Sequence, residues 1–378
     1  MKILQLGKFY PIRGGVEKVM WDLTRGLSQT GVACDMLCAW LPGEGIDAKD
    51  ESIYHKDDNY LEFPEGGRVW LIPALSKKAA TMLAPKMVGW LRRHASEYDL
   101  IDIHHPDPMA ALALLLSGFK GRVVLHWHSD IVSQKFFLFF YKPLQKWLIR
   151  RAERIIGTTP AYLGSSPFLK DVQNKCTAVP IGIDPVRFNE AMAQDLHNKH
   201  NGSVLLLSVG RLVPYKGFPY LIESMSLLPD YFHLLLIGEG PMRPKLEADI
   251  ARLGLESRVT MAGYADDAQL TASFGACDIF VLPSIYKTEA FGIVQLEAMS
   301  CGKPVVATRI PGSGTAWVNS DGVSGRNAEP ENPSSLADAI LAVYENRASY
   351  ADGARKRYEE CFTKEIMIQK TINIYDSI

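Results

Sequence analysis

What the 378-residue sequence lacks excludes several kinds of protein. Its six cysteines are scattered without a C-x-x-C pair, so neither a disulfide framework nor a zinc site is indicated. The longest uncharged apolar stretch, residues 108–119, is too short to cross a bilayer. The apolar residues 1–11 have the length of one strand and lack the layout of a signal peptide. We therefore expect a cytoplasmic chain with free thiols.

Neither sign of charge is in excess. The 41 lysines and arginines balance 42 acids, which gives no general sign of a nucleic-acid binder. A hydrophobic content of 47% with 22% charged residues is ordinary for a globular protein and excludes disordered and fibrous classes. The length favours two domains, because one domain usually takes roughly 100–200 residues.

Short apolar runs alternate with helical patterns along the whole chain. Runs such as LLLSVG and HLLLIG are apolar without alternation, which is typical of strands buried on both faces. We therefore predict an α/β protein with two Rossmann-like domains that carry parallel sheets. The expected parts are a first domain over 1–185, a polar linker over 186–202, a second domain over 203–350 and a helical segment over 351–378.

Ligands of parallel sheets bind outside the carboxyl ends of the strands, and the notable motifs of this sequence follow strands. Gly14 and Gly15 come after the first strand and open a helix. Glycines there let the backbone approach an anion at a helix N-terminus. A plain turn, with Glu17 favouring the helix dipole, explains the same residues equally well.

A basic motif, GRLVPYKG, follows the buried run 203–209. Arg211 and Lys216 stand five residues apart where a helix is expected to begin, which suits a diphosphate. A solvated basic turn is the alternative. We favour the diphosphate site.

An acidic motif, EAFGIVQLE, follows the predicted strand 279–282. A helix predicted over 290–300 places the second glutamate, Glu297, about 12 Å beyond the first, Glu289, at ~1.5 Å per residue. Such a span would let them meet the two ends of a nucleotide sugar. Acids among apolar helix residues are costly to bury without partners, which favours binding over two solvated acids.

Histidines gather where two strands end. His126 and His128 are two apart, so both point to one face if the strand continues. His104 and His105 end the preceding strand. A hydrogen bond from one histidine to a sugar hydroxyl is our preferred interpretation, structural filling of the strand ends is the alternative, and no nearby acid or cysteine has metal-ligand spacing.

Two glycine loops are weaker signals. The loop over 310–315 follows a strand and could close on a phosphate. The loop over 238–241 resembles the start of a dinucleotide fingerprint, but Arg243 stands where the third glycine belongs, so we discount NAD.

Two basic segments with aromatic or apolar residues, 76–94 and 133–154, are typical of helices that bind anionic membrane surfaces. Ordinary core faces with solvated lysines are the alternative. The basic residues of the second segment include Lys142, Lys146, Arg150 and Arg151.

Taken together, GRLVPYKG, TEAFGIVQLEAMSCGKPVVAT and HSDIVSQK resemble glycosyltransferase family 4, which has the GT-B fold. The resemblance runs from Met1 to the C-terminal helix. It implies two facing Rossmann-like domains with a cleft between them. It also implies a nucleotide-sugar donor held mainly by the second domain, an acceptor held mainly by the first, and retention of anomeric configuration. It implies no cofactor and no metal, which the absence of a D-x-D triplet fits.

The resemblance also assigns residues. The catalytic set it implies is His128, Arg211, Lys216 and Glu289. The donor-binding set is Gly14, Gly15, Tyr264, Phe291, Gly292, Ile293 and Glu297. On the acceptor or membrane side we place His105, Asp130, Lys142, Lys146, Arg150 and Arg151.

The loop from Ile310 resembles members that build O-antigen, capsule or exopolysaccharide on lipid-linked acceptors at the inner membrane. This favours GDP-mannose as donor, with UDP-hexoses and UDP-N-acetylhexosamines open. The other functions left open are a GT-B epimerase or phosphorylase and a sugar-binding protein without catalysis.

Overall fold

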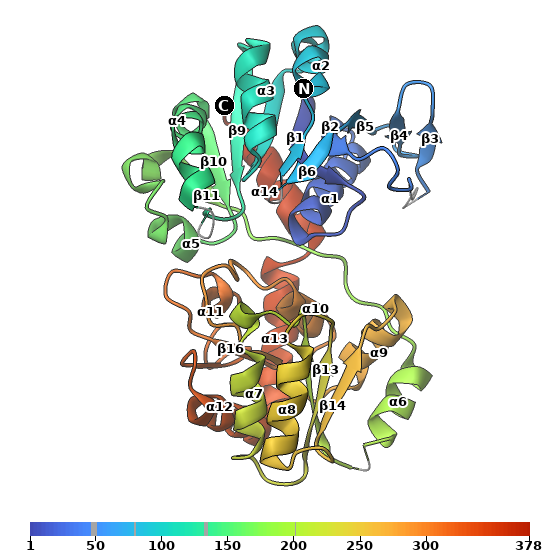
Figure 1. The fold of residues 1–378 in the computed structure, drawn as a ribbon, viewed down its shortest axis with the longest axis vertical. Coiled ribbons are helices and arrows are strands. Elements are labelled where there is room, and N and C mark those ends of the chain that lie inside the picture. Colours follow the sequence, from blue (N-terminus) through green and yellow to red (C-terminus); the bar gives the residue numbers. More distant parts are fainter. Residues whose placement is uncertain (47–50, 79–80, 132–134, 201) are drawn as a thin grey trace. The chain divides into compact units, whose positions relative to one another are not determined.

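Two α/β units divide the chain in the computed structural model, which describes residues 1–46, 51–78, 81–131, 135–200 and 202–378. Unit 1 comprises Met1–Ile181 and Lys364–Ile378, and unit 2 comprises Gly182–Thr363. Each unit alternates strands with helices, as the sequence predicts (Figure 1).

The described part of unit 1 is built on a nine-stranded sheet in the order β11-β10-β9-β8-β1-β2-β5-β4-β3. Pairing is parallel from β11 to β5, and β4 and β3 join antiparallel at the edge. The strands are β1 (Lys2–Tyr10), β2 (Ala33–Trp40), β3 (Ile53–His55), β4 (Tyr60–Glu62), β5 (Arg68–Pro73), β8 (Leu100–His105), β9 (Arg122–Trp127), β10 (Arg154–Gly157) and β11 (Cys176–Ala178). A separate hairpin joins β6 (Ser76–Lys78) to β7 (Thr81–Leu83).

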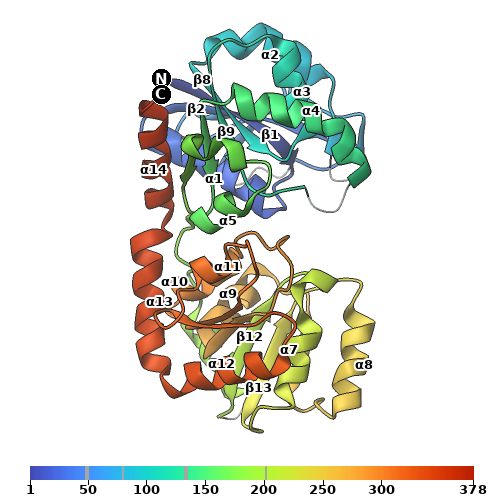
Figure 2. The same cartoon turned by 90° about the vertical axis from the view of Figure 1, so that its left-hand side faces the viewer.

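Helices cover both faces of this sheet. α2, α3 and α4 lie beside one another over one face, and α1 and α14 lie together over the other (Figure 2). α3 begins where Asp107 caps the amide of Ala110 at 3.0 Å and ends at the left-handed Gly118. The helices are α1 (Gly15–Gln29), α2 (Lys86–His94), α3 (Pro108–Ser117), α4 (Lys135–Arg151), α5 (Pro160–Ser165) and α14 (Lys364–Asp376), with 3₁₀ turns η1 (Ala95–Glu97) and η2 (Lys170–Lys175).

The described part of unit 2 carries a six-stranded parallel sheet in the order β14-β13-β12-β15-β16-β17. The order reverses between β12 and β15, and the carboxyl ends of these two strands are where such a sheet binds its ligand. The strands are β12 (Val204–Val209), β13 (Phe232–Ile237), β14 (Val259–Gly263), β15 (Ile279–Leu282), β16 (Val305–Thr308) and β17 (Gly325–Ala328).

The core of unit 2 fills with aliphatic residues of β12, β13 and β15, because these strands are buried on both faces. The helices of unit 2 are α6 (Glu190–Asn198), α7 (Phe218–Met225), α8 (Arg243–Leu253), α9 (Asp267–Ala276), α10 (Val294–Ser300), α11 (Thr315–Val318), α12 (Pro333–Glu345) and α13 (Arg347–Cys361), with the 3₁₀ turn η3 (Pro214–Lys216). Among the described helices of both units, none combines the length and the hydropathy needed to cross a membrane.

The unit boundaries differ from those expected. The predicted linker 186–202 contains α6, which packs against α9 through buried Ala193 and a 3.0 Å hydrogen bond from His197 Nδ1 to the carbonyl of Ala276. The predicted terminal segment 351–378 is divided: α13 belongs to unit 2, and α14 returns to unit 1. Gly26 of α1 permits this return, since a Cβ there would lie 2.1 Å from Ile368.

Candidate active site

The loop after β12 carries the basic motif. Lys216 closes the turn η3 and is 9% exposed, whereas Arg211 is exposed. Gly217 follows with φ +68°, and a Cβ there would lie 2.0 Å from the carbonyl oxygen of Pro283. Glycine is therefore required at 217, because only a residue without a Cβ lets this loop pack against Pro283, which follows β15.

Lys216 meets the first glutamate of the acidic motif. Its Nζ lies 2.6 Å from Glu289 Oε2, and the two side chains are 11% and 12% exposed. The Ser284 hydroxyl donates to the same carboxylate oxygen at 2.9 Å. The structure thus brings a cation and a carboxylate together at the ends of β12 and β15, as the carboxyl-end rule predicts.

The glycine loop over 310–315 holds the Glu289 segment through hydrogen bonds. The Ser313 hydroxyl donates to the carbonyl of Glu289, and the amide of Gly314 donates to the carbonyl of Ala290 at 2.9 Å. The hydroxyl of Thr308 donates to the carbonyl of Ser284. The sequence indicated this loop only weakly, as a possible phosphate contact. No sequence pattern indicated that Ser284 and Ser313 hold Glu289.

The helix of the acidic motif is shorter than predicted. α10 begins at Val294, because Gly292 adopts φ +78° and interrupts any helix from 290. The span of about 12 Å was derived from a helix over 290–300, and the structure has no helix over 290–293. Phe291 and Gly292 are buried and Ile293 is half-buried just before the helix, and Glu297 is half-buried in its first turn.

A third loop lies against the basic motif. Gly238 has φ +144°, and a Cβ there would lie 1.9 Å from the carbonyl oxygen of Gly210. Glu239 Oε1 accepts from the backbone amide of Tyr264 at 3.2 Å. The Tyr264 side chain itself is 79% exposed. Sequence reasoning examined this loop only for a dinucleotide and did not single out Glu239.

In unit 1, Gly14 and Gly15 stand at the start of α1, as expected. Gly14 is the N-cap and Gly15 the first helical residue. A Cβ on Gly14 would lie 2.1 Å from Glu17 Oε2, so the Glu17 carboxylate lies against the helix N-terminus. A carboxylate at that place favours the helix dipole, which is the plainer of the two interpretations.

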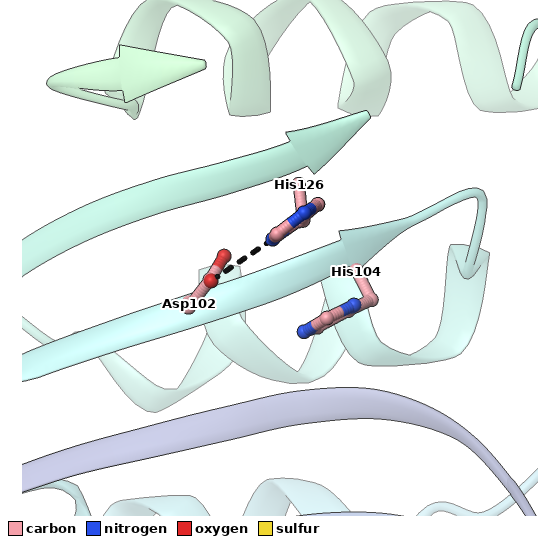
Figure 3. A group of neighbouring side chains, drawn as sticks. All are labelled: Asp102, His104 and His126. Carbon is pink, nitrogen blue, oxygen red and sulfur yellow. Dashed lines mark hydrogen bonds and ion pairs between the residues drawn. The ribbon is translucent and has the colours of Figure 1, made fainter. Parts of the chain in front are cut away.

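His104 of β8, His126 of β9 and His128, which follows β9, form one buried cluster. Figure 3 draws His104 and His126 with Asp102. The rings of His126 and His128 are parallel within 7° at 4.8 Å, which confirms that they share a face. His104 Nδ1 lies 2.8 Å from His128 Nε2, and His126 Nδ1 donates to Asp102 Oδ2 at 3.2 Å. Burial alone would raise the pKa of Asp102, but His126, His104 and the Tyr375 hydroxyl together bring that pKa below its ordinary value.

Contrary to the expectation that no acid accompanies these histidines, Asp102 gives the cluster the composition of a metal site. Ligand atoms of Asp102, His104 and His126 lie within 4.8 Å of one another. However, the rings of His104 and His126 are parallel within 9°, so their in-plane lone pairs do not converge on one point. Both nitrogens of His104 already have hydrogen-bond partners, Gln5 and His128. The residues fit a hydrogen-bond network better than an ion.

Two residues expected on the acceptor side, one buried and one half-buried, bond to neighbours within unit 1. His105 is 1% exposed, stacks on Trp127 at 3.8 Å and accepts from Gln145 Nε2 at 3.1 Å. Asp130 accepts from Ser166 Oγ at 2.7 Å and from the Trp127 indole at 3.0 Å. Both side chains therefore brace the end of β9 in this structure.

The first basic segment is only partly helical, whereas α4 covers most of the second. The described residues of 76–94 include β6, β7 and α2, and the large apolar residues of α2, Met87, Trp90 and Leu91, are buried in the core. Residues 133–134 of the second segment, with Val132 of HSDIVSQK, lie outside the described residues. On α4, Lys142, Lys146 and Arg150 are exposed. Arg151 is half-buried and donates to the carbonyl of Gly121.

Comparison with known proteins agrees with this arrangement. Residues 13–187 match the family model "Glycosyltransferase Family 4", and residues 192–360 match "Glycosyl transferases group 1". The chain is 30% identical over 318 residues to 2-deoxystreptamine glucosyltransferase of Streptomyces kanamyceticus, covering 77% of this chain and 80% of the relative. The chain belongs to glycosyltransferase family 4.

Two further likenesses span the whole glycosyltransferase. It is 29% identical over 386 residues to O-antigen chain mannosyltransferase C of Escherichia coli, covering 100% of this chain and 99% of the relative. The crystal structure of Anabaena HepE in complex with UDP superposes with a TM-score of 0.79 at 22% identity and covers 100% of both chains. The predicted α/β GT-B architecture is thereby confirmed.

Proposed function

We propose that this glycosyltransferase moves a hexose from a nucleotide-diphosphate sugar to a lipid-linked saccharide in the synthesis of a cell-surface polysaccharide such as O-antigen. The observation that carries the proposal is the contact between Lys216 and Glu289 at the ends of β12 and β15. It places a cation suited to phosphate beside a carboxylate suited to sugar hydroxyls.

GDP-mannose is the first donor we propose. The whole-length relative named an O-antigen chain mannosyltransferase supports it. UDP-hexoses and UDP-N-acetylhexosamines are the second candidates. The relative named a glucosyltransferase and the UDP complex of HepE support them.

The mechanism we propose needs neither metal nor cofactor. Departure of the nucleoside diphosphate builds negative charge on the phosphate and positive charge on the anomeric carbon. Arg211 and Lys216 would meet the first charge with preorganised cations, and Glu289 would hold hydroxyls of the sugar. His128 would contact the reacting sugar. As the bond from the anomeric carbon to the phosphate oxygen breaks, the acceptor oxygen would form a bond to that carbon on the same face. The leaving phosphate would take the acceptor's proton, so the anomeric configuration would be retained.

We further propose that unit 1 docks on the cytoplasmic face of the inner membrane. α3 carries exposed Leu112, Leu115 and Leu116, which are 39%, 40% and 45% exposed. α3 lies between α2 and α4 (Figure 2). The exposed cations of these neighbouring helices are Lys86, Arg92 and Arg93 on α2 and Lys142, Lys146 and Arg150 on α4. Exposed leucines on a helix between two helices with exposed cations suit anionic lipid headgroups.

A donor panel tests the reaction. The purified chain is given GDP-mannose, UDP-glucose, UDP-N-acetylglucosamine or other sugar nucleotides with a lipid-linked saccharide, with and without EDTA, and the product anomer is read by NMR. We expect one donor to be consumed in EDTA with retention. Release of an epimerised sugar without acceptor would instead indicate an epimerase, and binding without turnover would indicate a sugar-binding protein.

Variants connect that reaction to the site. Glu289→Gln should lower turnover by about 10² or more, since it removes a charge held at the sugar. The exposed Glu256 on unit 2 provides the control Glu256→Gln, which should keep full turnover. Equal turnover by both variants would contradict the role of Glu289.

Vesicle sedimentation tests docking. The triple change of Lys142, Lys146 and Arg150 to Gln should reduce binding to vesicles of phosphatidylglycerol with phosphatidylcholine, and replacement of the three α3 leucines by Asn should reduce it at any salt concentration. Arg252→Gln on α8 is the control, since it removes an exposed charge from unit 2. Binding that ignores charge, salt and these leucines would contradict the docking proposal.

A further inference from the structure

A buried chain of hydrogen bonds leads from the C-terminal helix to His128. Tyr375 of α14 donates its hydroxyl proton to Asp102 Oδ2 at 2.5 Å, and Gln5 Nε2 donates to the Tyr375 oxygen at 3.0 Å. On its other side Gln5 Oε1 lies 2.6 Å from His104 Nε2, and His104 Nδ1 lies 2.8 Å from His128 Nε2. Gln5, Asp102, His104 and Tyr375 are 0% exposed, and His128 is 3% exposed.

The chemistry of the groups sets the direction of every bond. The Asp102 carboxylate can only accept a hydrogen bond, so the Tyr375 hydroxyl must donate its one proton to it. The Tyr375 oxygen then accepts from Gln5, which turns the amide nitrogen of Gln5 toward Tyr375 and its carbonyl oxygen toward His104. That carbonyl also only accepts. His104 must therefore carry its proton on Nε2.

The same reasoning extends to His128. Burial lowers the pKa of His104 to about 3 and lowers the pKa of His128 well below its usual value, so both rings are neutral at physiological pH. A neutral His104 with its proton on Nε2 offers only a lone pair at Nδ1. His128 Nε2 must then donate to it, which leaves the Nδ1 of His128 as an acceptor.

That acceptor has no hydrogen-bond partner among the residues that the structure describes, although it is buried. Buried polar atoms without partners are rare in folded proteins and call for an explanation. A ligand hydroxyl would satisfy this nitrogen. Asp102 Oδ1 also lacks a partner among the described residues, but the other oxygen of that carboxylate accepts from Tyr375 and His126. The cluster thus combines a fixed proton pattern with a ring nitrogen of His128 that the described protein leaves unmatched.

We propose that Gln5 and Tyr375 are positioning residues that hold His128 in the Nε2–H tautomer, so that its Nδ1 lone pair accepts a hydrogen bond from a hydroxyl of the bound sugar. The role of the sugar rests on the proposed function, whereas the tautomer does not. In the opposite tautomer Nδ1 would carry a proton and could not accept from a hydroxyl. The relay therefore selects the tautomer that accepts.

Histidine ¹⁵N NMR of the full chain tests the relay without any substrate. Two-bond ¹H–¹⁵N spectra of protein labelled at histidine report which ring nitrogen is protonated, and His104→Gln and His128→Gln assign the two signals. We expect the proton on Nε2 in both rings. A protonated Nδ1 on His128 in the unmodified protein would overturn the proposal.

Two variants of Gln5 test control of the tautomer. Gln5→Leu removes the acceptor for His104. Either proton pattern then leaves one buried N–H without an acceptor, at His104 Nε2 or at His128 Nδ1, so the bias toward Nε2–H is lost and Nδ1–H signals should appear for both rings. Gln5→Glu keeps an oxygen toward His104 whether ionised or protonated, so both rings should stay as they are. An unchanged His128 in Gln5→Leu would overturn the relay. If Gln5→Leu does not fold, Tyr375→Phe replaces it. The Gln5 amide can then rotate and present its nitrogen to His104, so Nδ1–H signals should appear in the spectra. Their absence would overturn the role of Tyr375.

Kinetics separates this role from a structural one. Gln5→Leu should lower kcat in proportion to the fraction of His128 that carries its proton on Nδ1, with little change in the KM for the donor, and Gln5→Glu should restore most of it. A loss of stability with kcat unchanged would overturn the positioning role. If the unmodified protein turns over no sugar nucleotide, the proposed function fails while the tautomer assignment still stands on the spectra.

Discussion

Breaking the contact between Lys216 and Glu289 tests most directly how the two motifs of unit 2 are joined. Lys216→Met keeps the length of the apolar stem and removes the cation. Glu289 would then keep its carboxylate at 12% exposure with the Ser284 hydroxyl still donating to it. A buried charge that loses its partner destabilises the folded state, because it was desolvated in exchange for that partner.

The distance sets the size of the effect. At 2.6 Å and an effective dielectric constant of about 20, the gross attraction is about 6 kcal/mol. Much of it is offset by desolvation, and a fully buried pair that loses one member costs about 3–5 kcal/mol. Since both side chains keep some exposure, we expect Lys216→Met to lower the free energy of unfolding of unit 2 by about 2–3 kcal/mol.

Urea unfolding followed by hydrogen-exchange mass spectrometry gives the assay, because peptides from unit 2 report that unit separately. The double variant Lys216→Met with Glu289→Gln should lose about 1–2 kcal/mol less than the sum of the single variants, as contacting residues do. Lys245→Met, on the exposed face of α8, is the control and should change little. Additive losses within about 0.5 kcal/mol would refute the coupling and with it the bridge between the two motifs.

Two further predictions concern the scaffold of each unit. Gly217→Ala should destabilise unit 2 and weaken nucleotide binding, because a Cβ would lie 2.0 Å from the Pro283 carbonyl oxygen. The control is Gly254→Ala, which has a similar φ of +65° with nothing within 4 Å and should cost only the backbone strain of about 1–2 kcal/mol. Equal losses of unfolding free energy in urea would contradict the close approach at Gly217. Unit 1 should lose stability as the pH falls below about 6.5, the ordinary pKa of histidine, because the unfolded chain then binds protons that buried His104, whose folded pKa is about 3, does not bind. The loss should reach at most about 1.4 kcal/mol per pH unit for each such histidine and end near pH 3, and a flat stability of unit 1 between pH 7 and 4 would contradict it.

The fold was predictable because its signals are local. The run over 203–209 is apolar without alternation, and the structure has β12 there, buried on both faces in the centre of its sheet. The meeting of Lys216 with Glu289 was also within reach, since strands of a parallel sheet end at one edge and both motifs follow strands.

Other features depended on tertiary packing that no local pattern encodes. α10 begins late because Gly292 takes a left-handed conformation, which a helical pattern of apolar residues does not reveal. The link from Tyr375 to Asp102 joins residues far apart in the chain and exists because α14 packs back on α1 of unit 1. Ser284 and Ser313 carry no distinctive spacing, so their bonds to Glu289 could be found only in three dimensions.

Nucleotide binding to the purified protein tests the central claim most directly. GDP, UDP, ADP and CMP are each added to the unmodified chain and to Lys216→Met, with and without Mg²⁺, and the melting temperature is recorded. A nucleotide at 100 times its dissociation constant stabilises the bound state by about 2.7 kcal/mol. We predict that GDP or UDP alone raises the melting temperature of the unmodified chain without metal, and that Lys216→Met loses most of this shift. If no nucleotide stabilises the protein, or if Lys216→Met responds as strongly as the unmodified chain, the donor site is not where the ends of β12 and β15 meet.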